Sequence, residues 1–101
     1  MSAEAQFNSR RAGPTRAQTA RAAKRLAPVF HPRWSSRDDH AVMTARAKHK
    51  SFSDIAGDLG RSQIAVEQRW HRLRVIKGVV RLLEDYGLSG KPYPADGGGH
   101  G

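Results

Sequence analysis

Cysteine is absent from the chain, which excludes disulfides, thiolate-bound zinc, iron–sulfur clusters and cysteine nucleophiles. No run of about 18 consecutive apolar residues occurs, so we expect no transmembrane helix. No apolar stretch follows the first charged residues, so we also expect no secretory signal. We therefore expect a reducing compartment, either the cytoplasm and nucleoid of a bacterium or the nucleus of a eukaryotic cell.

Acidic residues are also scarce. The 101 residues include 9 Asp and Glu against 18 Lys and Arg, for a formal net charge of +9. The excess lies in residues 1–33, with seven basic residues against one acidic, and in residues 34–78, with nine against five. Apolar residues make up only 38%, which allows one small core. A small basic protein most often binds a polyanion, usually nucleic acid, although a basic tail can also act only in solubility.

Residues 1–33 are predicted to form a flexible basic arm. Within it, residues 15–27 favour a helix, because good helix formers follow a candidate N-cap, Thr15, and precede Pro28. Since Leu26 is the only large apolar residue there, we expect a nascent helix that becomes ordered on DNA or against the domain. The candidate DNA contacts of this segment, on the backbone or in the neighbouring minor groove, are Arg21, Lys24 and Arg25.

Residues 34–77 are predicted to form a domain of three short helices, at about 36–48, 52–58 and 62–75. A serine precedes each helix and can cap its first turn: Ser35, Ser51 and Ser62. Gly60 can adopt the positive φ of a turn between the second and third helices, which is the helix-turn-helix pattern. The third helix gathers apolar side chains on one face: Val66, Trp70 and Leu73.

Residues 78–87 are predicted to form an extra short C-terminal helix, because their apolar residues recur at helical spacing and Gly87 ends the segment. We expect this helix to cover an open side of the three-helix core. Alternatively, its apolar face forms a homodimer through Val79, Leu82, Leu83 and Tyr86. Residues 88–101, which include three consecutive glycines, are predicted to be a flexible tail.

Four stretches carry a recognisable pattern: WSSRDD at 34–39, FSDIA at 52–56, LGRS at 59–62 and AVEQRWHRL at 65–73. They resemble a Myb/SANT-type DNA-binding repeat, whose three large aromatics stand at similar intervals to Trp34, Phe52 and Trp70. The resemblance covers residues 34–74 and implies an all-α, homeodomain-like bundle of three helices. Aromatic rings at this spacing can meet in one core cluster.

The resemblance implies that the third helix enters the major groove of DNA. The implied base-contacting residues are Gln63, Glu67, Gln68, His71 and Arg72, with Ile64 nearer the helix start. Helical spacing independently predicts that these side chains point away from the apolar face. Gln can form hydrogen bonds with adenine, Arg with guanine and Glu with cytosine. The candidate phosphate contacts are Lys48, Lys50, Arg61, Ser62 and Arg74. Arg69 is expected to pair with Asp38 or Asp39 instead.

We predict a transcription regulator that binds double-stranded DNA and acts with RNA polymerase or another transcription protein. Two alternatives remain open: a protein-interaction adaptor on the transcription machinery, and an RNA-associated protein. We expect no enzyme and no cofactor, because the chain carries no nucleophile elbow, phosphate loop or helical metal motif. We also expect no metal site, since His31, His40 and His49 are too widely spaced along the chain.

Overall fold

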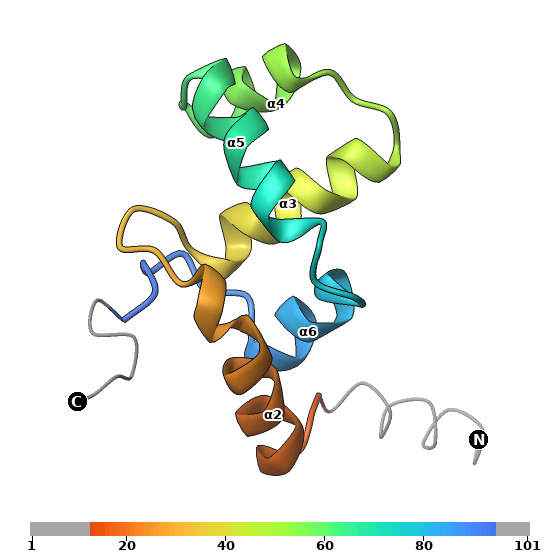
Figure 1. Cartoon of the computed structure of the whole chain (residues 1–101), viewed down its shortest axis with the longest axis vertical. Coiled ribbons are helices and arrows are strands. Elements are labelled where there is room, and N and C mark those ends of the chain that lie inside the picture. The colour runs from red at the N-terminus through yellow and green to blue at the C-terminus, as the bar shows by residue number, and fades with distance from the viewer. Residues whose placement is uncertain (1–12, 95–101) are drawn as a thin grey trace, which may run out of the picture.

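The structure of the chain is a computed structural model that describes residues 13–94 (Figure 1). Its helices are α2 (Arg16–Leu26), the 3-10 turn η1 (Ala27–Val29), α3 (Ser36–Ala47), α4 (Phe52–Leu59), α5 (Gln63–Leu73) and α6 (Val79–Tyr86). The prediction of an all-α fold is confirmed for this range. Within it, no helix combines the length and the apolar character needed to cross a membrane.

The helix boundaries follow from local signals. Ser35, Ser51 and Ser62 each accept a hydrogen bond from the backbone N–H three residues on, at 3.0–3.1 Å, so all three predicted N-caps are confirmed. Such a cap typically contributes about 1 kcal/mol to helix stability. Gly60 ends α4 with a φ of 66°, a left-handed conformation that glycine adopts without strain, and α5 begins three residues later.

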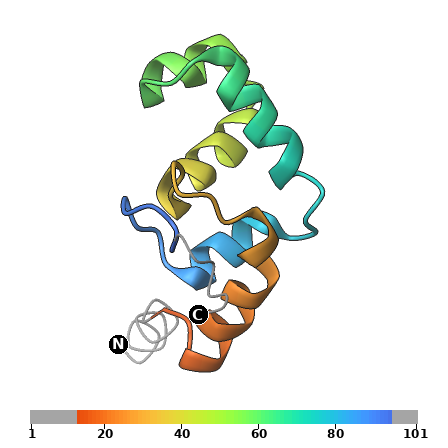
Figure 2. The same ribbon diagram turned by 60° about the vertical axis from the view of Figure 1, so that its left-hand side comes forward.

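The first helix, α2, packs against α6, as Figure 2 shows. Ala22 and Leu26 are fully buried, and Leu26 shares an apolar cluster with Leu83 of α6. Thr19 also donates a hydrogen bond to the carbonyl of Asp85 at 3.0 Å. Residues 13–33 therefore do not form a flexible arm. The helix predicted at 15–27 is present and is ordered against the domain, because α6 supplies the apolar partner that α2 needs. The remainder of the predicted arm, residues 1–12, lies outside the described range.

The same packing accounts for the apolar face of α6. Val79 and Leu83 are buried in the cluster with Leu26, and Leu82 and Tyr86 are half-buried beside it. The helix spans the predicted residues and covers the core, as expected. The homodimer alternative was based on an unpartnered face, and within this chain that face is already occupied by α2 and α3.

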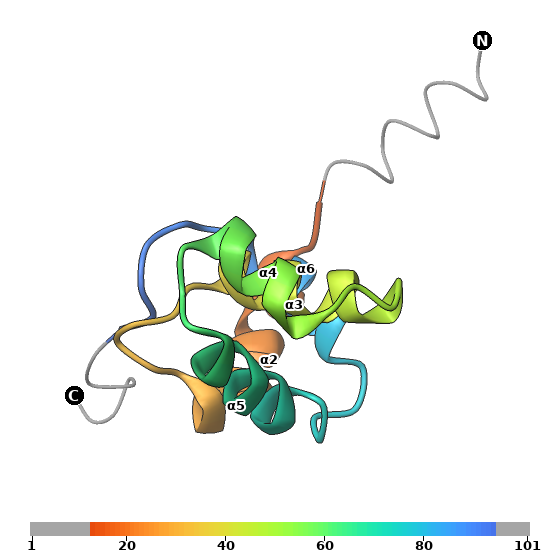
Figure 3. The same ribbon diagram turned by 90° about the horizontal axis from the view of Figure 1, so that it is seen from above.

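A second apolar cluster holds α3, α4 and α5 together, and the view in Figure 3 shows these three helices side by side. Val42, Ile55 and Val66 are its most deeply buried members. The predicted meeting of three aromatics in one cluster is confirmed, since Trp34, Phe52 and Trp70 all belong to it. Phe52 and half-buried Trp70 meet edge to face at 5.5 Å between ring centroids, whereas Trp34 lines the same cluster beneath arginine side chains.

Residues 88–94 do not form the predicted flexible tail. They fold back over the start of α3, where the Tyr93 backbone N–H donates to the Trp34 carbonyl at 3.0 Å. The Tyr93 ring is 3% exposed and stacks on Phe30 at 4.6 Å. The folded unit therefore runs beyond both ends of the predicted 34–77 domain, and residues 95–101 of the predicted tail lie outside the described range.

Candidate nucleic-acid interface

The outer face of α5 carries most of the predicted base-contacting side chains. Opposite the buried Val66 and Leu73, the exposed residues of α5 are Gln63, Ile64, Gln68, His71 and Arg72, while Glu67 is half-buried. Successive residues of an α-helix are rotated by about 100° around its axis, which puts Ile64, Gln68 and His71 at the centre of this face. The structure thus brings the predicted base contacts together on one surface, which we call the α5 outer face.

The inner face of α5 is fixed to α3 by a buried ion pair. Arg69 donates from Nε and Nη2 to both carboxylate oxygens of Asp39, at 2.8 and 2.7 Å, and from Nη2 to the Val29 carbonyl at 2.6 Å. The Arg69 side chain is 4% exposed and that of Asp39 is fully buried. The prediction that Arg69 pairs with Asp38 or Asp39 is confirmed.

Tyr93 completes this buried network. Its hydroxyl donates to Oδ2 of Asp39 at 2.6 Å. Burial, together with the negative charge of Asp39, raises the pKa of Tyr93 far above its ordinary value, so the hydroxyl stays a neutral donor. The network therefore connects α3, α5, the segment before α3 and the C-terminal segment, and it holds the α5 outer face in one orientation.

Some predicted phosphate contacts are already engaged within the protein. Arg61 donates to Asp38 at 2.9 Å, and its guanidinium lies 3.9 Å from the Trp34 ring centroid. Lys50 pairs with Asp58, whose carboxylate raises the pKa of the Lys50 amine. Each of these cations already has a carboxylate partner, which reduces the attraction left for a phosphate.

The other predicted DNA contacts outside the α5 outer face divide into four groups. Lys48 is exposed after α3. Arg74 donates to His71 Nδ1 at 3.2 Å and lies 5.2 Å from the Trp70 ring centroid. Ser62 uses its hydroxyl as the α5 cap. The predicted DNA contacts on α2 are all exposed: Arg21, Lys24 and Arg25.

The C-terminal ends of α2 and α5 are joined by two arginines. Arg25 donates to the Lys77 carbonyl at 3.3 Å, and Arg72 donates to the Pro28 carbonyl at 3.4 Å. These contacts place the last basic turn of α2 beside the last turn of α5. The two segments that were predicted to contact DNA separately are therefore neighbours in the fold.

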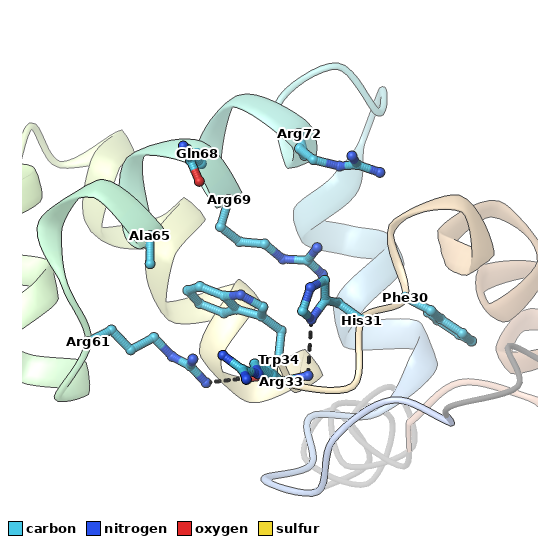
Figure 4. Close-up of a pocket in the computed structure, with 9 residues that line it drawn as sticks. All are labelled: Phe30, His31, Arg33, Trp34, Arg61, Ala65, Gln68, Arg69 and Arg72. Carbon is cyan, nitrogen blue, oxygen red and sulfur yellow. Dashed lines mark hydrogen bonds between the residues drawn. The ribbon is translucent and has the colours of Figure 1, made fainter.

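A cleft of about 440 Å³ opens beside the α5 outer face (Figure 4). The side chains that line it belong to the segment before α3, to the turn before α5 and to α5 itself: Phe30, His31, Arg33, Trp34, Arg61, Ala65, Gln68, Arg69 and Arg72. Sequence reasoning missed this cleft. It considered Arg33 only as part of the arm and His31 only as a metal ligand to be excluded, although Pro28 and Pro32 restrict the backbone of this segment.

The fold and this surface define a small all-helical protein with one exposed, mostly polar helix face and exposed basic residues beside it, Arg33 and Arg74. No protein family, curated protein or solved structure was found to match the chain. Within residues 13–94, no three His, Asp or Glu side chains converge as metal ligands would.

Proposed function

We propose that this protein is a transcription regulator that binds duplex DNA by inserting α5 into the major groove. The observation that carries the proposal is the division of α5 into two faces. One face is held in the core by Arg69, while the other exposes side chains able to read base edges, Gln68 and Arg72 above all. A single α-helix fits the width of the major groove.

The charges around α5 support a polyanionic ligand. The two carboxylates of α3 nearest to α5, Asp38 and Asp39, are each neutralised by an arginine. Glu67 is the one acidic residue of α5 itself. The exposed cation at the C-cap of α5, Arg74, would attract a phosphate of the strand beside the groove.

The proposal includes a Myb/SANT-like helix-turn-helix for α3, α4 and α5. It is supported by the serine cap before each helix, by the left-handed turn at Gly60 and by the contact between Phe52 and Trp70. In the same proposal, α2 and α6 are additions that stabilise the three helices, and the basic residues of α2 extend the positive surface.

The test is the binding of a labelled duplex of random sequence, followed by fluorescence anisotropy over a range of salt concentrations. With about 4–6 phosphates contacted, log affinity is expected to fall with log salt at a slope of about −4 to −5. An RNA duplex should compete poorly, because its deep, narrow major groove cannot admit a helix. A slope near zero would refute DNA binding. Capture of RNA polymerase that survives high salt, without any duplex binding, would instead favour the adaptor alternative.

The basic residues of α2 are expected to act on the backbone and not on the bases. Replacing Arg21 and Lys24 together by glutamine should make the salt slope less steep by up to about 2, with unchanged base preference. The substitutions keep Leu26 in the core, whereas deletion of residues 1–27 would remove buried Ala22 and Leu26 and is expected to unfold the protein. An unchanged slope in the double variant would remove α2 from the interface.

A further inference from the structure

The cleft beside the α5 outer face has an excess of positive charge. Four arginines and one histidine line it. Two of the arginines, Arg61 and Arg69, are paired with Asp38 and Asp39 respectively. The side chain of Arg33 is exposed and has no ion-pair or hydrogen-bond partner among residues 13–94.

The segment that carries Arg33 is held in place by its own backbone. The Arg33 N–H donates to Nδ1 of His31 at 3.0 Å, and the Arg33 carbonyl accepts from Arg61 Nη2 at 2.7 Å. The Trp34 N–H donates to the His31 carbonyl at 3.1 Å. Arg33 therefore stands on a fixed turn, so that little backbone entropy is lost when its side chain binds a ligand.

The contact between Arg33 and His31 also determines what the imidazole can offer. Because Nδ1 accepts a hydrogen bond, the neutral ring carries its proton on Nε2, which is then a donor. Figure 4 shows the His31 ring between Arg33 and the α5 side of the cleft, with Gln68 at the rim. The cleft thus combines hydrogen-bond donors with positive charge, which is the chemistry that an anionic phosphate requires.

We propose that this cleft binds one phosphodiester group of the DNA strand bordering the groove that α5 enters, with Arg33 and His31 as its main donors. The inference rests on the proposed function and adds two contact residues to it. Gln68 and Arg72 belong both to the α5 outer face and to the cleft lining, so a helix seated in the groove brings a strand backbone to the cleft.

The experiment compares Arg33→Gln with Arg81→Gln, which removes the same charge from an exposed pair on α6. Loss of one phosphate contact lowers the salt slope by about 0.9, so the affinity ratio between 50 and 200 mM salt should shrink by about 3.5-fold. Only Arg33→Gln should show this change, and its base preference should stay as in the unmodified protein. Circular dichroism should give the same helical signal for both variants.

A second arm uses duplexes in which one phosphate at a time is replaced by a neutral methylphosphonate. One position should weaken binding of the unmodified protein but add no further loss to Arg33→Gln.

If the protein binds DNA and the two variants behave alike, the cleft proposal is wrong while the proposed function stands. If no duplex binds at low salt, the proposed function itself fails. Saturable binding of AMP that depends on Arg33, without any Arg33 effect on DNA, would assign the cleft to free phosphate ligands and overturn the proposal.

Discussion

Replacing Arg69 by alanine is expected to destabilise the fold by about 3–5 kcal/mol, because the Asp39 carboxylate would stay buried without its partner. Asp39 is fully buried and receives both of its short guanidinium hydrogen bonds from Arg69. A small domain has only about 5–15 kcal/mol of total stability, so the variant should be largely unfolded in mild urea. Urea denaturation followed by circular dichroism measures the change.

Two further variants separate this effect from a general loss of charge. Arg81→Ala breaks an exposed ion pair with Asp85 and should leave the urea midpoint unchanged. Combining Asp39→Asn with Arg69→Met should recover part of the lost stability, since no uncompensated charge then remains in the core. A loss below about 1 kcal/mol for Arg69→Ala would show that the pair does not hold α5 on α3.

Replacing Arg72 by alanine is expected to change which DNA sequences the protein selects. Arginine can donate two hydrogen bonds to guanine, so loss of Arg72 should cost about 1–3 kcal/mol at one base position and relax the preference there. Because Arg72 is exposed, the fold should persist. Selection of binding sites from random duplex DNA, at one stated salt concentration, measures the preference.

Arg74→Ala is the matched control, because it removes the same charge two residues further along the chain, at the C-cap of α5. Arg74 was predicted to contact phosphate, so its loss should weaken binding to all sequences about equally. If Arg72→Ala also weakened every sequence alike and left the selected site unchanged, Arg72 would be a backbone contact and not a base contact.

Much of the fold was predictable because its signals are local. A serine caps a helix by accepting a hydrogen bond from the backbone N–H three residues later. The left-handed turn at Gly60 depends only on the missing side chain of that one residue. The bounds of α6 follow from apolar spacing between Gly78 and Gly87. Each of these features needs only a few neighbouring residues, so the sequence pattern contains them.

The parts that could not be predicted depend on distant partners. Leu26 alone gave α2 little to bury, but in the fold it meets Leu83, more than fifty residues later. Tyr93 follows a glycine-containing segment whose composition predicts a flexible tail. Its hydroxyl donates to the buried Asp39 carboxylate, a contact that exists only in the folded chain. Such contacts carry no periodic signal in the segments that make them.

The candidate site divides in the same way. Helical spacing was enough to place Gln68 and His71 on the outer face of α5. It was not enough to show that Arg61 is paired with Asp38, because which charges pair depends on distances in three dimensions. The cleft beside α5 was missed for the same reason, since Arg33 reaches it only through the fixed turn before α3.

The most direct test of the central claim, that the α5 outer face meets the duplex, is an NMR titration of isotope-labelled protein with unlabelled duplex DNA. We predict that the NMR signals of Ile64, Gln68 and His71 shift most, while the signals of the exposed α6 residues Arg81 and Glu84 do not shift. Shifts concentrated on α6, with the α5 signals unchanged, would contradict that claim.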